Sequence, residues 1–216
     1  KAYATLDGAP VSGDTPAATL RPGTVDPALF TATVDADAED PFIQEEAAKL
    51  RYDPQAIFNF LHTQIGYQSY YGSMRGARGT LWSGAGNALD VASLGVALMR
   101  VSGIPAQYVQ GTLTAAQAQP LIRSMFPPQT QTFGTIPPGT PTADPAHDPK
   151  LLAETEAHAW FQFDTGNGMT DADPLMPGAT IGQTFTTAQG SPFAAVPASL
   201  QATTHVVLNA EITSSA

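Results

Sequence analysis

Residues 88–102 constrain the fold more strongly than any other part of the chain, because this segment is apolar on nearly every side. Its apolar residues recur around the whole helical circumference, which is typical of a buried central helix rather than a surface helix. Asn87 is a favourable N-cap, and Asp90 brings a carboxylate to the free N–H groups of the first turn. Gly103 favours a helix end, and Pro105 prevents continuation.

Four segments predict strands. "AQYVQGTL", which follows the central helix, alternates between apolar and polar residues. In "AHAWFQF", residues 157–163, Ala157, Ala159, Phe161 and Phe163 share one face, and His158, Trp160 and Gln162 share the other. "MTDADPLM" predicts a short strand that ends at a proline, and "THVVLNAEI" predicts a last strand.

Proline and acidic residues predict two further helices before the central one. Asp40 precedes Pro41 and Asp53 precedes Pro54, so helices are expected over about 41–50 and 54–64. Residues 66–86 are glycine-rich and predict a long loop, and residues 114–126 predict a modest helix. Residues 127–149 are rich in proline, threonine and glycine and predict a surface loop, and the chain from there to residue 199 is loop-rich after its short strands.

The composition argues against several classes of protein. A formal net charge of −10 with nine Lys and Arg residues disfavours nucleic-acid binding. The chain has no cysteine, so disulfides and thiolate metal sites are excluded. His62, His147, His158 and His205 show no metal-ligand spacing, and no phosphate-binding glycine motif is present, so we expect neither a metal nor a cofactor. No apolar run is long enough for membrane insertion.

The order of motifs resembles the transglutaminase-like superfamily, which shares the papain-like cysteine-protease core. The matching elements are "GNALD" at the start of the central helix, "LMRVSGIPAQYVQG" after it, "HAW" at 158–160 and Asp173-Pro174, so the likeness runs from about Asp40 to Pro174. The resemblance implies an α+β fold in which a buried central helix packs on an antiparallel sheet. More narrowly, residues 70–112 look like a bacterial subgroup found in large secreted or surface proteins.

The resemblance also assigns roles to particular residues. In the family, a cysteine at the helix N-terminus is the nucleophile, because the helix dipole lowers the pKa of its thiol. His158 then corresponds to the base and Asp173 to the residue that orients it, with Asp171 as the competing carboxylate. Backbone N–H groups at the helix start correspond to an oxyanion hole. Trp82, Asn87, Tyr71 and Trp160 are candidates for the substrate cleft.

The nucleophile position is occupied by Ala88, which has no chemistry to offer an acyl-transfer reaction. Three explanations are open: a natural relative without the cysteine, a Cys-to-Ala change in an active enzyme, or another nucleophile such as Ser83. The surroundings of Ala88 favour the first. Ser83 is disfavoured because it lies five residues upstream of Ala88, beyond the reach of the helix amides.

These observations lead to competing hypotheses about function. The first is a non-catalytic module that binds a peptide or protein, or is structural, within a larger exported bacterial protein. The second is a Cys-dependent protease, amidase or protein cross-linker inactivated at Ala88, and the third is a plain structural spacer. Because the chain opens with Lys1 and shows no signal peptide, we expect a fragment of a longer secreted or cell-surface protein.

The expected domain organisation has three parts. Residues 1–39 predict an extended arm or linker, because turn-forming residues dominate and no lasting periodicity is present. Residues 40–199 form the predicted domain. Residues 200–216 predict a C-terminal strand or the start of a following domain.

Overall fold

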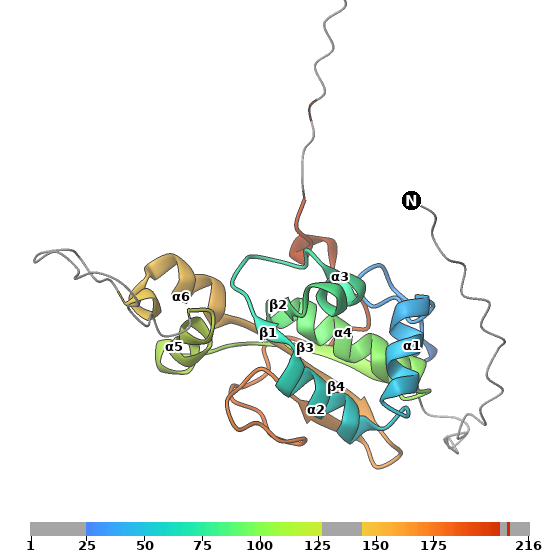
Figure 1. Cartoon of the computed structure of the whole chain (residues 1–216). Helices are drawn as coiled ribbons and strands as arrows, with labels where there is room; N and C mark the ends of the chain where they lie inside the picture. Colours follow the sequence, from blue (N-terminus) through green and yellow to red (C-terminus); the bar gives the residue numbers. More distant parts are fainter. Residues whose placement is uncertain (1–24, 127–143, 204–206, 208–216) are drawn as a thin grey trace, which may run out of the picture.

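The computed structural model describes residues 25–126, 144–203 and 207, which form helices packed around a central helix, with a small sheet on one side of it (Figure 1). Helix α4 (Ala88–Val101) lies in the centre, with α1 to α3 around it and strands β3 and β4 on another side (Figure 1). Within the described ranges, no helix is both long enough and apolar enough to cross a bilayer.

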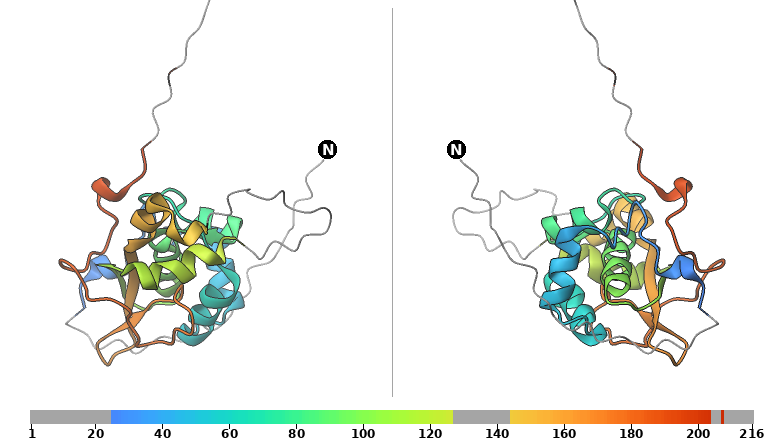
Figure 2. Two further views of the ribbon diagram at one scale, coloured as in Figure 1. Left: turned by 90° about the vertical axis from the view of Figure 1, so that its left-hand side faces the viewer. Right: turned by 90° about the vertical axis from the view of Figure 1, so that its right-hand side faces the viewer.

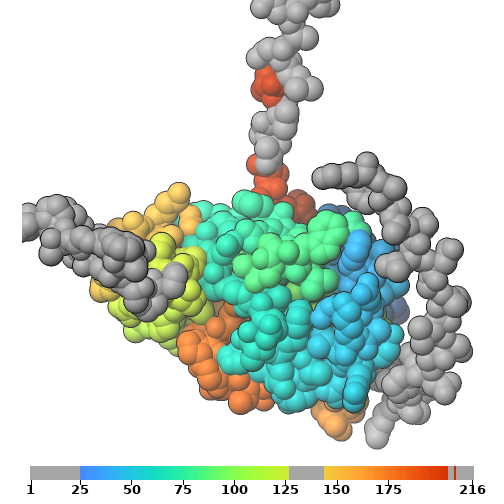
Figure 3. Space-filling view, viewed as in Figure 1, coloured from blue at the N-terminus to red at the C-terminus, as the bar shows by residue number. Residues whose placement is uncertain are grey.

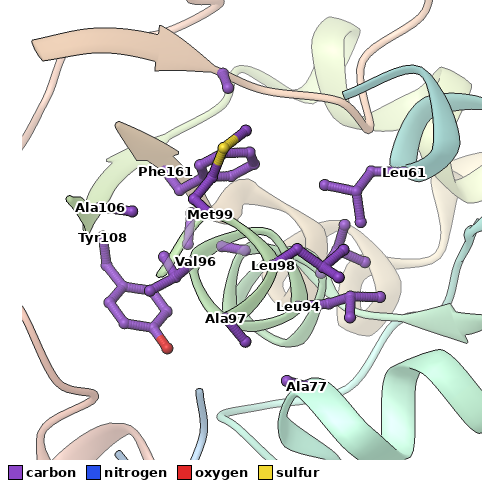
Figure 4. Packing of buried hydrophobic residues seen from close by; sticks show 14 of the residues in the cluster. Leu61, Ala77, Leu94, Val96, Ala97, Leu98, Met99, Ala106, Tyr108 and Phe161 are labelled. Carbon is purple, nitrogen blue, oxygen red and sulfur yellow. The ribbon is translucent and has the colours of Figure 1, made fainter. Parts of the chain in front are cut away.

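Helix α4 confirms the prediction of a buried central helix. Every residue from Ala88 to Arg100 is buried, and the side chain of Asn87 accepts the N–H of Asp90 at 2.9 Å as an N-cap. The helix ends before Gly103, whose φ of 71° is the left-handed conformation that glycine adopts most readily. Figure 4 shows side chains projecting from α4 in several directions, with Met99 beside Phe161 of the sheet and Leu94 on the side of Leu61.

The main sheet has the antiparallel order β3-β4-β5, formed by Ala106–Thr112, Ala157–Asp164 and Met169–Ala172. Its register pairs Gly111 with His158. The sheet packs closely on α4, since a Cβ on Gly95 would lie only 2.4 Å from the Phe161 ring. Only a residue without a side chain allows this approach, so Gly95 fixes the distance between the helix and β4.

Helices α1 (Pro41–Lys49) and α2 (Pro54–Gln64) confirm the predictions made from the two Asp-Pro pairs. Asp40 accepts the N–H groups of Phe42 and Ile43, and Asp53 accepts that of Ala56. Both helices contribute buried apolar side chains to the core around α4, including Ile43, Ile57 and Leu61.

The prediction of a single long loop over residues 66–86 is wrong. The segment holds helix α3 (Gly76–Ser83), and strands β1 (Gly66–Tyr67) and β2 (Ala85–Gly86) pair in parallel at its two ends. Glycines at 76 and 79 give α3 a low intrinsic helix propensity. Packing of Ala77 and Thr80 into the interior compensates, because both side chains are buried.

Residues 114–126 contain the predicted helix, α5 (Ala115–Ser124). The predicted loop over residues 127–149 is too long at its C-terminal end, because helical elements begin before residue 149. A 3-10 helix, η2 (Pro145–His147), and helix α6 (Pro149–Glu156) precede β4. Helices α5 and α6 lie side by side at one end of the molecule (Figures 1 and 2). Residues 127–143 and the predicted strand at 204–212, apart from Val207, lie outside the described residues.

The described part of the predicted N-terminal arm packs against the domain. It begins with the 3-10 helix η1 (Pro27–Leu29) and buries Leu29, Asp35 and Ala36. Arg100 of α4 donates to the carbonyl oxygens of Thr31 at 2.6 Å and Ala194 at 2.6 Å, so one buried guanidinium joins this segment to the C-terminal region. The residues of this segment and of α1 form a continuous surface in Figure 3.

The chain after β5 is loop-rich, as predicted, and its last described helical element is the 3-10 helix η3 (Ala198–Leu200). Phe193 and Ala188 form isolated bridges with Tyr108 and Gly111 of β3. The segment crosses Gly111 closely, since a Cβ there would lie 2.6 Å from Thr186. Through these bridges, the C-terminal loop extends one edge of the sheet near His158.

Candidate functional site

The N-terminus of α4 is held by a buried polar network centred on Asp90. This carboxylate is fully buried and accepts hydrogen bonds from the Tyr70 hydroxyl at 2.7 Å, the Ser73 hydroxyl at 2.9 Å, and the N–H groups of Met74, Arg75 and Gly76. The network fixes the segment before α3 to the start of α4.

Asn87 and Tyr70 complete the attachment of this segment. The Asn87 amide donates to the carbonyl oxygens of Tyr70 and Gly72, and the Tyr70 hydroxyl accepts the N–H of Asn87. Burial, followed by the hydrogen bond to Asp90, raises the pKa of Tyr70 well above its ordinary value. Tyr70 therefore remains a neutral hydrogen-bonding group, and the helix start is rigidly framed.

His158 and Asp173 form a buried pair. His158 Nε2 lies 2.8 Å from Asp173 Oδ2, and the two residues are 2% and 1% exposed. Among the described residues, His158 Nδ1 and Asp173 Oδ1 have no hydrogen-bond partner. The hydrogen bonding of Asp173 therefore differs from that of Asp90, both of whose oxygens have partners.

Asp171, the competing carboxylate, has different partners. Its Oδ1 accepts the Trp160 indole N–H at 2.7 Å and the Gln162 amide at 2.8 Å. These bonds hold β5 against β4 on the sheet. The geometry thus pairs His158 with Asp173 and gives Asp171 a cross-strand contact.

A cleft of about 260 Å³ opens beside His158 and the start of α4. The residues on either side of Ala88 both line it, whereas Ala88 itself is 5% exposed. The lining comes from segments distant in sequence: Tyr70, Tyr71, Gly72, Asn87, Leu89, Gln110, Gly111, Thr112, Glu154, Ala157, His158, Ala159, Gln189 and Leu200. The α4 N-terminus and the histidine therefore face a common space.

Two of the four predicted cleft candidates line this cleft, namely Tyr71 and Asn87. Trp160 does not, because its side chain is buried and its indole N–H is bound to Asp171. Trp82 does not either: it lies on α3 with 63% of its surface exposed, and its ring meets that of Phe42 edge-on at 5.1 Å. Trp82 is close to Asn87 in sequence, but helix α3 directs its side chain away from the cleft.

The remaining nucleophile and histidine candidates lie apart from the cleft. Ser83 is exposed at the end of α3 and donates its hydroxyl to the Gly79 carbonyl at 2.7 Å. His62 Nδ1 lies 2.6 Å from the carbonyl oxygen of Pro174, and His147 is in η2. His205 is outside the described residues. In the part of the chain that the structure describes, no group of His, Cys, Asp and Glu side chains could hold a metal ion.

Sequence reasoning missed the far wall of the cleft, including Gln110, Glu154, Gln189 and Leu200. The alternating sequence of β3 predicts that Gln110 lies on a strand, but it does not predict what surrounds the Gln110 side chain. Glu154 lies on α6, which was not predicted, although Asp148 before Pro149 repeats the helix-start pattern at residues 40 and 53. That repeated pattern is the signal that could have identified it.

The chain belongs to the transglutaminase-like superfamily, because the model of that family matches residues 37–174. The match includes α4, the "HAW" strand and Asp173, and the α+β fold with a transglutaminase-like core confirms the predicted fold class. The family match begins at residue 37, within the segment of residues 1–39 that was predicted as an arm.

The chain also resembles a solved structure from Cytophaga hutchinsonii that is provisionally named a cysteine protease. The two share 19% identity with a TM-score of 0.44, over 76% of this chain and 50% of the other. The chain thus spans about half the length of that protein. A search of curated proteins found no significant match.

Proposed function

We propose that this transglutaminase-like domain binds a peptide segment in the cleft beside His158 and does not perform acyl transfer with a thiol of its own. The observation that supports this proposal is the combination of a buried His158–Asp173 pair with Ala88 at the start of α4. The chain contains no cysteine at any position.

The chemistry of the family reaction explains why Ala88 is decisive. A thiolate attacks the acyl carbon, the histidine shuttles the proton to the leaving group, and backbone N–H groups stabilise the oxyanion. A methyl group can supply no electron pair for the first step. The groups that remain can bind and orient a carbonyl or amide, and this is the function we assign to them.

The form of the cleft supports a peptide rather than a large ligand. Its volume of about 260 Å³ lies below the usual range for small-molecule sites, about 300–1,000 Å³, and suits one or two side chains. Gln110 and Gln189 bring amides that can both donate and accept, and Tyr71 exposes its ring at the cleft. Such groups suit a peptide, in which polar backbone amides alternate with side chains that are often apolar.

Two measurements test the proposal. The chain should show no amine incorporation, deamidation or proteolysis of a mixed peptide substrate, and detectable turnover would contradict the non-catalytic role. It should bind fluorescent peptide pools, and Gln110→Trp, which fills the cleft, should abolish this binding. Gln107→Trp on the same strand is the matched control, because Gln107 does not line the cleft.

A longer exported bacterial protein is the context that we propose for this domain. The support is compositional: the N-terminal segment is rich in Ala, Thr, Pro and Gly, which is common in linkers of such proteins. Detection of the native protein in the culture medium or on the cell surface would agree with this context. Its confinement to the cytoplasm would contradict it.

The second candidate function is a Cys-dependent protease, amidase or protein cross-linker in which alanine has replaced the nucleophile. The observation that favours it is that the His158–Asp173 pair retains its 2.8 Å contact. The natural gene distinguishes the two functions: an alanine codon at position 88 excludes this candidate, and a cysteine codon supports it.

A further inference from the structure

We propose that the cleft selects a peptide carrying a lysine or arginine side chain, and that Glu154 is the residue that determines this specificity. The inference rests on the proposed peptide-binding function and names the chemistry of the ligand. Glu154 lines the cleft, and its side chain is only 8% exposed. A carboxylate with so little contact with water interacts strongly with any cation that enters beside it.

The carboxylate of Glu154 is only partly satisfied by its neighbours. Oε2 accepts the Ser69 hydroxyl at 2.7 Å, which orients the group. Oε1 lies 4.0 Å from Lys150 Nζ, at the outer limit of an ion pair, and the Lys150 side chain is 80% exposed. Contacts of this kind contribute little, so Oε1 retains capacity for a cationic donor.

The other groups at the cleft reinforce this selection. Besides Glu154, the titratable side chains that line it belong to Tyr70, Tyr71 and His158, and none of its described lining residues is Lys or Arg. The chain as a whole carries a formal net charge of −10. An acidic ligand would therefore meet repulsion without a counter-charge, whereas a basic ligand meets attraction both at long range and on contact.

Tyr71 supplies a surface for the rest of such a side chain. It is 57% exposed and lines the same cleft. Lysine and arginine bury their methylene groups on apolar surfaces while their charged ends seek polar partners, and a tyrosine ring also attracts a cation over its face. The cleft thus offers the methylene groups of a basic side chain a contact with Tyr71 and its charged end a contact with Glu154.

Fluorescence polarisation with four peptide pools tests the inference. The pools share mixed neutral flanking residues and differ in a fixed central lysine, arginine, norleucine or glutamate. The lysine and arginine pools should bind about tenfold more tightly than the norleucine pool, because a hydrogen bond to a charged group discriminates by this amount or more. The glutamate pool should bind most weakly.

Matched variants separate a local contact from general charge. Glu154→Gln should bring the lysine and arginine pools to the affinity of the norleucine pool, because glutamine still accepts from Ser69 but carries no charge. Glu156→Gln removes the same charge on the same helix at a residue that does not line the cleft, and it should preserve the preference. Lys150→Ala should strengthen binding of the basic pools slightly by removing a competitor.

The outcomes separate the two proposals. If all pools bind the chain alike, or if Glu156→Gln abolishes the preference as fully as Glu154→Gln, the role of Glu154 is overturned while peptide binding stands. If no pool binds, both proposals fail. Circular dichroism of each variant verifies folding, and Glu154→Asp provides a second test because it retains the charge and should retain the preference.

Discussion

Two buried aspartates, Asp90 and Asp173, lie in the same domain but in opposite hydrogen-bonding situations. Asp90 accepts from two hydroxyl groups and from the backbone of residues 74–76, and neither of its oxygens lacks a partner. Asp173 contacts His158 through one oxygen, and its other oxygen has no partner in the described residues. Both residues are almost completely shielded from water.

The difference separates two kinds of buried carboxylate, one with all its hydrogen bonds made and one with a single partner among the described residues. Fully satisfied buried networks stabilise a fold and specify its geometry, whereas partly satisfied ones cost free energy unless they serve another purpose. On this criterion Asp90 builds the frame around the α4 N-terminus, whereas Asp173 contributes fewer hydrogen bonds to the fold. Stability should therefore depend strongly on Asp90 and weakly on Asp173.

The largest effect should come from Asp90→Asn. In either orientation of the new amide, its NH₂ group faces backbone N–H groups that now donate to Asp90. These buried N–H groups therefore lose their acceptor. The free energy of unfolding should fall by about 3 kcal/mol, measured by urea denaturation. A loss of less than about 1 kcal/mol would show that Asp90 does not organise this region.

Tyr70→Phe should have an intermediate effect. It removes the hydroxyl that donates to Asp90 and accepts from Asn87 N–H while preserving the ring. A loss of about 2 kcal/mol is expected from these two hydrogen bonds. Tyr71→Phe is the matched control, because Tyr71 is exposed and its hydroxyl has no such role; an equal loss in both variants would contradict the network.

Asp173→Asn should cost about 1 kcal/mol or less. The amide can direct its oxygen to His158 Nε2, and the position of Oδ1 has no partner to lose. Urea denaturation under the conditions used for Asp90→Asn makes the comparison direct. The contrast between the two aspartates is lost if both substitutions destabilise the domain equally.

The smallest effect concerns alkaline pH. The pKa of Tyr70 is raised in the folded state, first by burial and then by the hydrogen bond to Asp90. Above about pH 10 the unfolded tyrosine loses its proton while the folded one keeps it, so stability should decrease as the pH rises. Tyr70→Phe should reduce the slope of unfolding free energy against pH; an unchanged slope would contradict the shift.

The elements that sequence reasoning predicted have strong local signals. Helix α4 is apolar on all sides and is bounded by Asn87 and Gly103, and α1 and α2 begin at Asp-Pro pairs. Such signals depend only on neighbouring residues, and the local structure that they predict agrees with the structure that the whole fold adopts. His158 and Asp173 were identified from motif order, which is information about a family rather than about local structure.

The elements that it missed depend on tertiary contacts. Helix α3 contains glycines that disfavour a helix, and its start is fixed by Asp90, a residue later in the chain. The cleft is assembled from segments between Tyr70 and Leu200, and no local pattern brings Glu154 and Gln189 together. Trp82 shows the opposite error, because closeness in sequence to Asn87 did not place it in the cleft.

The central claim is that the site around Ala88 lacks only a nucleophile, and the variant Ala88→Cys tests it most directly. Because the chain has no cysteine, the absorbance of the introduced thiolate can be titrated with the parent chain as the blank. We expect a thiol pKa well below the ordinary value of about 8.5, and a rise toward that value when His158→Gln is added. A thiol pKa at or above the ordinary value, unchanged by His158→Gln, would contradict the account.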